Sequence, residues 1–131
     1  MDLESSFNSL SVENYPPIFN NCAILIEGVH TEIIQTHFSN YINLIVTQFG
    51  KIGNLYQVKV DQPANGFSIS EAIYTINTLL GGDNFEAEVA ARYLTEKLKI
   101  SQPLLLSLSL KNFSKGTLDL IIEAIQSHTK L

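Results

Sequence analysis

A lysine between two glycines is the part of the sequence whose spacing comes nearest to a nucleotide-binding loop. The stretch VTQFGKIGNL, residues 46–55, places Gly50 and Lys51 after an apolar run that predicts a strand. A phosphate-binding loop needs GxxxxGK followed by Ser or Thr, because its glycines let backbone amides converge and its hydroxyl holds magnesium. Here Ile52 follows the lysine, the upstream glycine is absent, and the next residues predict a strand. We therefore interpret the stretch as a hairpin turn, with Gly50 and Gly53 at positive φ.

The histidines and the cysteine are the next residues that could carry chemistry. His30 and His37 are seven residues apart on one predicted strand, so alternation sends them to opposite faces, and His128 is far away in sequence. No His, Cys, Asp or Glu spacing matches a metal motif. Cys22 lies in an apolar strand without an adjacent base, which predicts a buried, inert thiol. We expect no catalytic residues, no metal and no cofactor.

An alternative function remains open at LLGGD, residues 79–83, which precedes a predicted helix. A helix N-terminus can hold an anion, so the chain could be a small-molecule-binding or anion-binding α+β domain, or an enzyme using this turn. The simpler interpretation is a capping box in which Asp83 caps the helix and Glu86 reaches back.

The first half of the chain is typical of antiparallel strands. Short apolar or alternating segments are separated by turn residues and predict a four-stranded meander: residues 22–28, 31–38, 41–50 and 54–60. Residues 61–68 are rich in Pro, Asn, Gly and Asp and predict a loop. Residues 72–82 fit a helix or a strand by period, and their β-branched residues and closing glycines favour a strand.

The second half changes period. Residues 84–99 predict an amphipathic helix, 104–110 a leucine-rich strand, and Ser114 can cap a helix that runs to about Ser127. The apolar positions expected to define the two helix stripes are Phe85, Val89, Tyr93, Ala90, Leu94 and Leu98 in the first, and Leu118, Ile121, Ile122 and Ile125 in the second. The order βββββαβα predicts an α+β fold with a mostly antiparallel six-stranded sheet, or a β-sandwich, flanked by helices.

The strand at 41–50 is apolar on both faces, which requires cover on both sides of the sheet. Either the sheet folds over on itself, or a partner covers the second face. Tyr41 and Ile45 share one face of this strand, and we expect that face to form a dimer interface.

Composition limits the partners. The chain has 131 residues, the size of one domain; it is 45% hydrophobic and carries a formal charge of −5, which argues against nucleic acid and anionic membranes. One cysteine and a start without the pattern of an export signal predict a cytoplasmic protein, also present in the nucleus. Residues 1–16 predict a flexible tail and 17–131 a single domain.

Several motifs together resemble one family. LIVTQFGKIGNL (44–55), TLLGGD (78–83) and KNFSKGTLDLIIEAI (111–125) are similar to proteasome assembly chaperone 3. The resemblance implies a non-catalytic, ATP-independent chaperone that pairs with a related small chaperone, proteasome assembly chaperone 4. It also implies binding to α-type subunits of the 20S proteasome while their ring is built. Apart from the resemblance, the apolar second face of the sheet suggests a homodimer when the chain is isolated.

Five residues near the turns are the candidates for partner binding: Gln48, Phe49, Lys51, Ile52 and Asp83. Simpler roles compete with binding at three of them. Phe49 alternates with Tyr41 and Ile45, which predicts a core position. Lys51 suits a solvated turn, and Asp83 suits a helix cap.

Overall fold

The computed structural model describes residues 16–50, 52–61 and 73–128. In these ranges, strands and helices follow the predicted order βββββαβα, which confirms the α+β fold class. The elements are β1 Ile18–Ile26, β2 Val29–His37, β3 Ile42–Thr47, β4 Asn54–Asp61, β5 Ile73–Leu80, α2 Phe85–Lys97, β6 Leu104–Ser109 and α3 Lys115–His128. Residues 1–15 of the predicted tail and most of the predicted loop at 61–68 lie outside the described ranges. No described helix is long and apolar enough to cross a membrane.

The six strands form one sheet in the order β1-β2-β3-β6-β4-β5. Only β1, β2 and β3 form the predicted meander; β4 does not pair with β3, because β6 lies between them, parallel to β3 and antiparallel to β4. The expectation of a four-stranded meander is therefore wrong at its fourth strand. The leucine-rich β6 lies in the middle of the sheet, where Leu104, Leu106 and Leu108 are buried.

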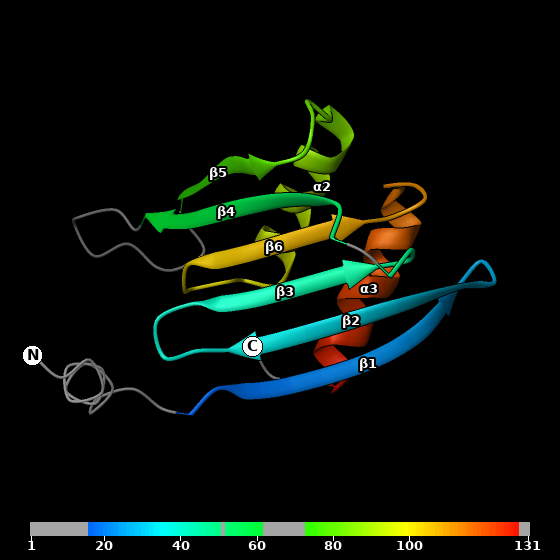
Figure 1. The fold of residues 1–131 in the computed structure, drawn as a ribbon, viewed down its shortest axis with the longest axis horizontal. Helices are drawn as coiled ribbons and strands as arrows, with labels where there is room; N and C mark the ends of the chain where they lie inside the picture. The colour runs from blue at the N-terminus through cyan, green and yellow to red at the C-terminus, as the bar shows by residue number, and fades with distance from the viewer. Residues whose placement is uncertain (1–15, 51, 62–72, 129–131) are drawn as a thin grey trace, which may run out of the picture.

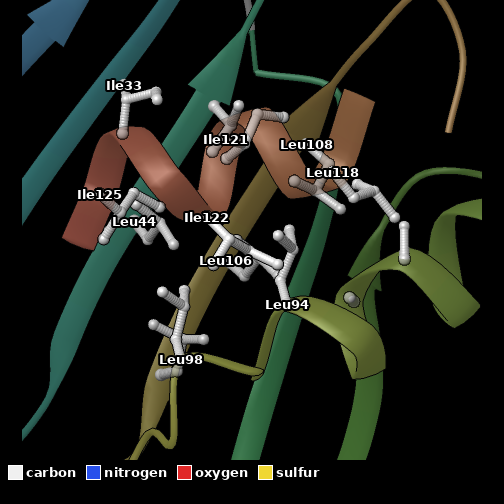
Figure 2. Packing of buried hydrophobic residues seen from close by; sticks show 14 of the residues in the cluster. Ile33, Leu44, Leu94, Leu98, Leu106, Leu108, Leu118, Ile121, Ile122 and Ile125 are labelled. Atoms are coloured by element: carbon white, nitrogen blue, oxygen red, sulfur yellow. The ribbon is translucent and has the colours of Figure 1, made fainter. Parts of the chain in front are cut away.

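Both helices cover the same face of this sheet (Figure 1). That face presents one apolar row from each central strand, including Leu44, Leu106 and Val58, all fully buried. From α3, Ile121 and Ile125 pack onto β3 and β6, and from α2, Leu94 meets Leu106 (Figure 2). Within the described residues the sheet does not fold over on itself, so the core is a two-layer arrangement of helices on a sheet.

The helix α3 forms as its sequence predicts. The Ser114 hydroxyl accepts a hydrogen bond from the Thr117 backbone amide at 3.2 Å, so Ser114 is the cap. The predicted inward stripe is confirmed, since Leu118, Ile121, Ile122 and Ile125 are buried.

The predicted apolar stripe of α2 is confirmed in part, because Ala90, Leu94 and Leu98 are buried whereas Phe85 and Val89 are exposed. Its N-cap is Asn84, whose side chain accepts from the Ala87 amide at 3.1 Å, so the predicted Asp83 cap is wrong. The side that meets the sheet carries small residues, with Ala87, Ala90 and Ala91 fully buried beside Leu94. Small side chains let the helix approach the sheet closely, and Phe85 and Val89 are left on its outer side.

Candidate functional site

The candidate residue Gln48 has a structural role at the end of β3. Its backbone amide donates to the Ser109 carbonyl at 2.8 Å, and its side-chain amide donates to the Thr31 hydroxyl at 3.1 Å. Its side-chain oxygen accepts from the Lys111 backbone amide at 2.7 Å. Gln48 thus joins β2, β3 and the segment that follows β6, and so fixes where the next residues of the chain begin.

Those next residues cross the end of β6 to reach β4. Gly53 lies directly against this strand, because a Cβ atom at position 53 would overlap the Leu108 carbonyl oxygen and approach the Ser109 Cα to 3.0 Å. Gly50 has the predicted positive φ of 67°, whereas Gly53 does not have a positive φ. The predicted hairpin turn is wrong; the segment is a crossing connection, and Gly53 is needed for its close approach to the backbone.

Phe49 and Ile52 project from this connection. Phe49 is 54% exposed and Ile52 is 57% exposed, so the prediction that Phe49 lies in the core is wrong. Asp83 is also exposed, next to the Asn84 cap. Lys51 lies outside the described residues.

More exposed apolar side chains lie at the same end of the sheet, where β3, β5 and β6 end and β4, α2 and α3 begin (Figure 1). Leu80 pairs with Leu55 near the start of β4, and a Cβ on Gly81 would overlap the Asn54 side chain, so the β5–α2 turn lies beside the 48–53 connection. We call the exposed side chains of this region the apolar end: Phe49, Ile52, Leu79, Leu80, Phe85 and Val89.

A groove of about 530 Å³ between α2 and α3 continues the apolar end. Phe85 and Val89 from α2 and Phe113 from the β6–α3 loop line it. Beside them, the Tyr93 hydroxyl donates to the Asp119 carboxylate at 2.6 Å, and Lys115 contacts the same carboxylate at 3.0 Å. The hydrogen bond from Tyr93 and the Lys115 charge lower the pKa of Asp119.

The face of the sheet opposite the helices is the second candidate surface. A register row crosses it from β2 to β4, consisting of Ile34, Ile45, Ser107 and Leu55. Leu105 lies one row along, next to Asn43 of β3. We call this surface the open face. Its centre is apolar, and no described element of the chain lies over it (Figure 1).

The structure places both residues of the predicted dimer face here. Ile45 is half-buried at the centre of the open face. Tyr41 precedes β3 and stacks on Phe38 with ring centroids 4.5 Å apart. Tyr41 also lines a shallow depression of about 380 Å³ with Leu105 and Gln57, whose side chains belong to the open face.

The histidines and the cysteine do not come together. His30 lies 3.3 Å from Glu32 on the open face, and His37 lies 3.3 Å from Gln35 on the helix side, as the alternation predicts. Burial lowers the pKa of His37 and raises the pKa of the half-buried Cys22 thiol. Among the described residues, no cluster of His, Cys, Asp and Glu could hold a metal ion.

Sequence reasoning missed four members of the apolar end: Leu79, Leu80, Phe85 and Val89. The spacing of apolar residues along α2 predicts that Phe85 and Val89 lie on a buried stripe, but both are exposed. The alanines at 87, 90 and 91 were the available signal, because they form a second apolar face on the same helix, narrow enough to pack closely.

The chain is similar to one group of known proteins. A family model for proteasome assembly chaperone 3 matches residues 44–128. The chain is 33% identical over 102 residues to proteasome assembly chaperone 3 of Mus musculus, covering 76% of this chain and 82% of that protein. It is 29% identical over 126 residues to the Nematostella vectensis protein of the same name, covering 89% and 93%.

A solved structure shares the fold. One chain of a chaperone complex for yeast 20S proteasome assembly superposes with a TM-score of 0.63 at 20% identity, covering 86% of this chain and 98% of that chain. The family match spans more than half of the sequence and includes the 48–53 connection, the β5–α2 turn and both helices. The chain belongs to the proteasome assembly chaperone 3 family, whose members are non-enzymatic chaperones of proteasome assembly.

Proposed function

We propose that the protein pairs with a related small chaperone through its open face and presents its apolar end to α-type subunits while the 20S α ring is built. The observation that carries this proposal is the one-sided packing of the sheet, which leaves the apolar centre of the open face without cover from the described chain. Monomeric proteins rarely expose such a surface, because burying it against a partner is favourable.

The open face suits a partner that is itself a sheet. Ile34, Ile45 and Leu55 lie at neighbouring register positions on strands β2, β3 and β4, with only Ser107 of β6 between them. A second sheet of the same kind can pack on this apolar surface, as two sheets do in a sandwich. We propose a chaperone resembling proteasome assembly chaperone 4 as this partner, and a second copy of the chain in its absence.

The apolar end suits the client. It is built from connections anchored to the sheet by Gln48, Gly53 and Gly81, so its side chains are held before any subunit arrives. A preformed surface that binds one assembly intermediate better than others raises the population of that intermediate. The proposed activity is independent of nucleotide. In support, the segment after Lys51 leads into the strand β4, whereas a phosphate loop leads into a helix. We place this activity in the cytoplasm and the nucleus.

The direct test mixes the purified protein with individual α-type subunits, with and without the related chaperone, and detects complexes by native mass spectrometry. We expect a complex with at least one α-type subunit. If no α-type subunit binds under either condition, the proposed function is wrong.

Replacing Phe49 with serine is expected to weaken binding of the α-type subunit about tenfold, because an apolar anchor of the apolar end is lost. The exposure of Phe49 predicts little change in melting temperature. Leu120→Ser is the matched control, since Leu120 is exposed on α3, outside the apolar end. Titration by biolayer interferometry measures both variants; equal affinities would remove Phe49 from the client surface.

The buried hydroxyl of Ser107, in the central row of the open face, provides a test of the packing of the isolated chain. Its hydroxyl oxygen is buried and has no hydrogen-bond partner among the described atoms. Removing an unsatisfied buried hydroxyl costs little, so Ser107→Ala is expected to leave the free energy of unfolding unchanged or raise it by up to about 1 kcal/mol. Thermal melting of the isolated chain measures this, and a clear loss of stability would show that the hydroxyl is satisfied in the folded protein.

A further inference from the structure

The strand β5 forms an edge of the sheet and lacks the usual protection against pairing. Its sequence, IYTINTLL, contains no charged residue and no proline. Natural edge strands commonly carry such residues, because their unpaired backbone groups are a template for another strand. At its end, Leu79 and Leu80 are exposed and lead directly into the turn of the apolar end.

The hydrogen-bond pattern identifies which backbone groups of β5 point outward. The Ile42 amide donates to the Pro103 carbonyl at 2.9 Å, and the Gln48 amide donates to the Ser109 carbonyl at 2.8 Å. The backbone amides and carbonyls of the odd-numbered residues of β6 therefore point toward β3. Since backbone groups alternate in direction along a strand, Leu104 and Leu106 of β6 face β4.

The same alternation continues through β4. In β4, Val58 pairs with Leu104 and Tyr56 pairs with Leu106, so the backbone groups of Val58 and Tyr56 point toward β6. The backbone groups of the odd-numbered residues of β4 therefore point toward β5. These odd-numbered residues of β4 pair with three residues of β5: Ile73, Thr75 and Asn77. The amides and carbonyls that point away from the sheet consequently belong to the three alternate residues, Tyr74, Ile76 and Thr78.

An independent contact agrees with this assignment. The Arg92 guanidinium of α2 donates to the Tyr74 carbonyl at 3.2 Å, as a group outside the ladder can. Arg92 covers this first outward position, and within residues 16–50, 52–61 and 73–128 no strand pairs with the outer side of β5, so the backbone groups of Ile76 and Thr78 are available to an added strand.

The surroundings of the edge define the chemistry of that strand. On the helix side, Glu88 and Glu96 lie four residues on either side of Arg92. The contact of Arg92 with the Tyr74 carbonyl places this part of α2 beside β5. Burial raises the pKa of Tyr74, and the Glu96 carboxylate raises it further. An added strand therefore needs a polar or basic side chain toward α2. On the open face, the exposed Ile73 and Leu80 at the two ends of β5 favour apolar side chains, and Thr75 and Asn77 lie between them.

A second copy of the chain is a poor match for this edge. Twofold pairing of β5 with itself would bring the Glu88 and Glu96 carboxylates of two α2 helices together, between chains that each carry a formal charge of −5. Like charges brought together in this way oppose association.

We propose that β5 accepts an extended segment of the client α-type subunit as an additional strand, with apolar residues toward the open-face side and at least one basic residue toward α2. This inference rests on the proposed function and specifies how the client is held. The added strand runs along Ile76 and Thr78 and reaches the apolar end, so main-chain bonds and apolar contacts act on the same client.

Hydrogen exchange measured by NMR tests the proposal residue by residue. In the free protein, the amides of Ile76 and Thr78 are expected to exchange rapidly and those of Thr75 and Asn77 slowly. Addition of a purified α-type subunit should slow exchange at Ile76 and Thr78 by about tenfold or more. Binding without this protection overturns the strand addition and leaves the proposed function intact. An absence of binding overturns both.

Two matched proline variants test the direction of the backbone groups. Thr78→Pro removes an outward amide and is expected to keep the melting temperature within roughly 3 °C, while weakening subunit binding about tenfold. Thr75→Pro removes an amide that bonds to β4 and should lower the melting temperature by roughly 5 °C or more. Thr78→Val keeps the amide and should bind normally. Equal destabilisation by both prolines, or equal binding by Thr78→Pro and Thr78→Val, overturns the inference.

Discussion

Replacing Ile45 with glutamate is expected to abolish the proposed pairing with the related chaperone while the isolated chain remains folded. Ile45 lies at the centre of the open face, flanked by Ile34 on β2 and Ser107 on β6. In the isolated chain the new carboxylate can still reach water, because the side chain at this position is only half-buried. In the paired state it would be buried without a partner, at a cost of about 3 kcal/mol or more, a factor of at least about 100 in Kd.

The matched control is Leu120→Glu, which introduces the same carboxylate at an exposed position of α3. Sedimentation velocity with the related chaperone measures pairing, and circular dichroism melting measures the fold. The expected result is loss of pairing for Ile45→Glu only, with both variants folded. A folded Ile45→Glu variant that still pairs with full affinity would show that the interface lies on another surface.

Much of the fold follows from short-range patterns in the sequence. The alternation of side chains along β2 correctly predicted that His30 and His37 lie on opposite faces of the sheet. The β-branched content of residues 72–82 correctly favoured a strand, which the structure has at Ile73–Leu80. These predictions succeeded because they depend on the geometry of one element. The neighbours of β4 depend instead on where β6 inserts, and β6 comes more than forty residues later in the sequence. No local pattern carries that information.

The candidate site was predicted in part. The turns around Ile52 and Asp83 were identified, and the structure brings them to one end of the sheet. The exposure of Phe49 and Phe85 was missed, because an apolar residue at a regular period is normally buried. Helix α2 has two apolar faces that both fit the helical period, one with large and one with small side chains. The face with the small side chains is the buried one. Side-chain size decided between the two faces, since a close helix–sheet contact leaves no room for Phe.

The two proposed surfaces can act at the same time because their centres lie in different parts of the molecule, although they meet at Leu80, which pairs with Leu55 of the open face. The open face is the broad side of the sheet, whereas the apolar end and the β5 edge lie at one end and one margin of it (Figure 1). Substitutions away from this boundary, such as those at Ile45 and Phe49, should therefore affect one surface only, which allows pairing and client binding to be measured separately.

The 48–53 connection links the fold to the client surface, and Gly53 is its most demanding position. A Cβ atom there would overlap the Leu108 carbonyl oxygen and approach the Ser109 Cα to 3.0 Å, both backbone atoms that cannot rotate away. We expect Gly53→Ala to reduce the free energy of unfolding by about 2–3 kcal/mol, because the connection must lift from the end of β6. This displacement also moves Phe49 and Ile52, so subunit binding should weaken.

Gly82→Ala is the matched control for this substitution. Gly82 lies in the β5–α2 turn of the same region, and a Cβ atom there would meet nothing within 4 Å. Its effect on the free energy of unfolding should stay within about 0.5 kcal/mol. Urea titrations of both variants measure the difference. Equal stabilities would contradict the close approach at Gly53. A destabilised Gly53→Ala variant that binds the α-type subunit with unchanged affinity would show that the connection supports the fold without shaping the client surface.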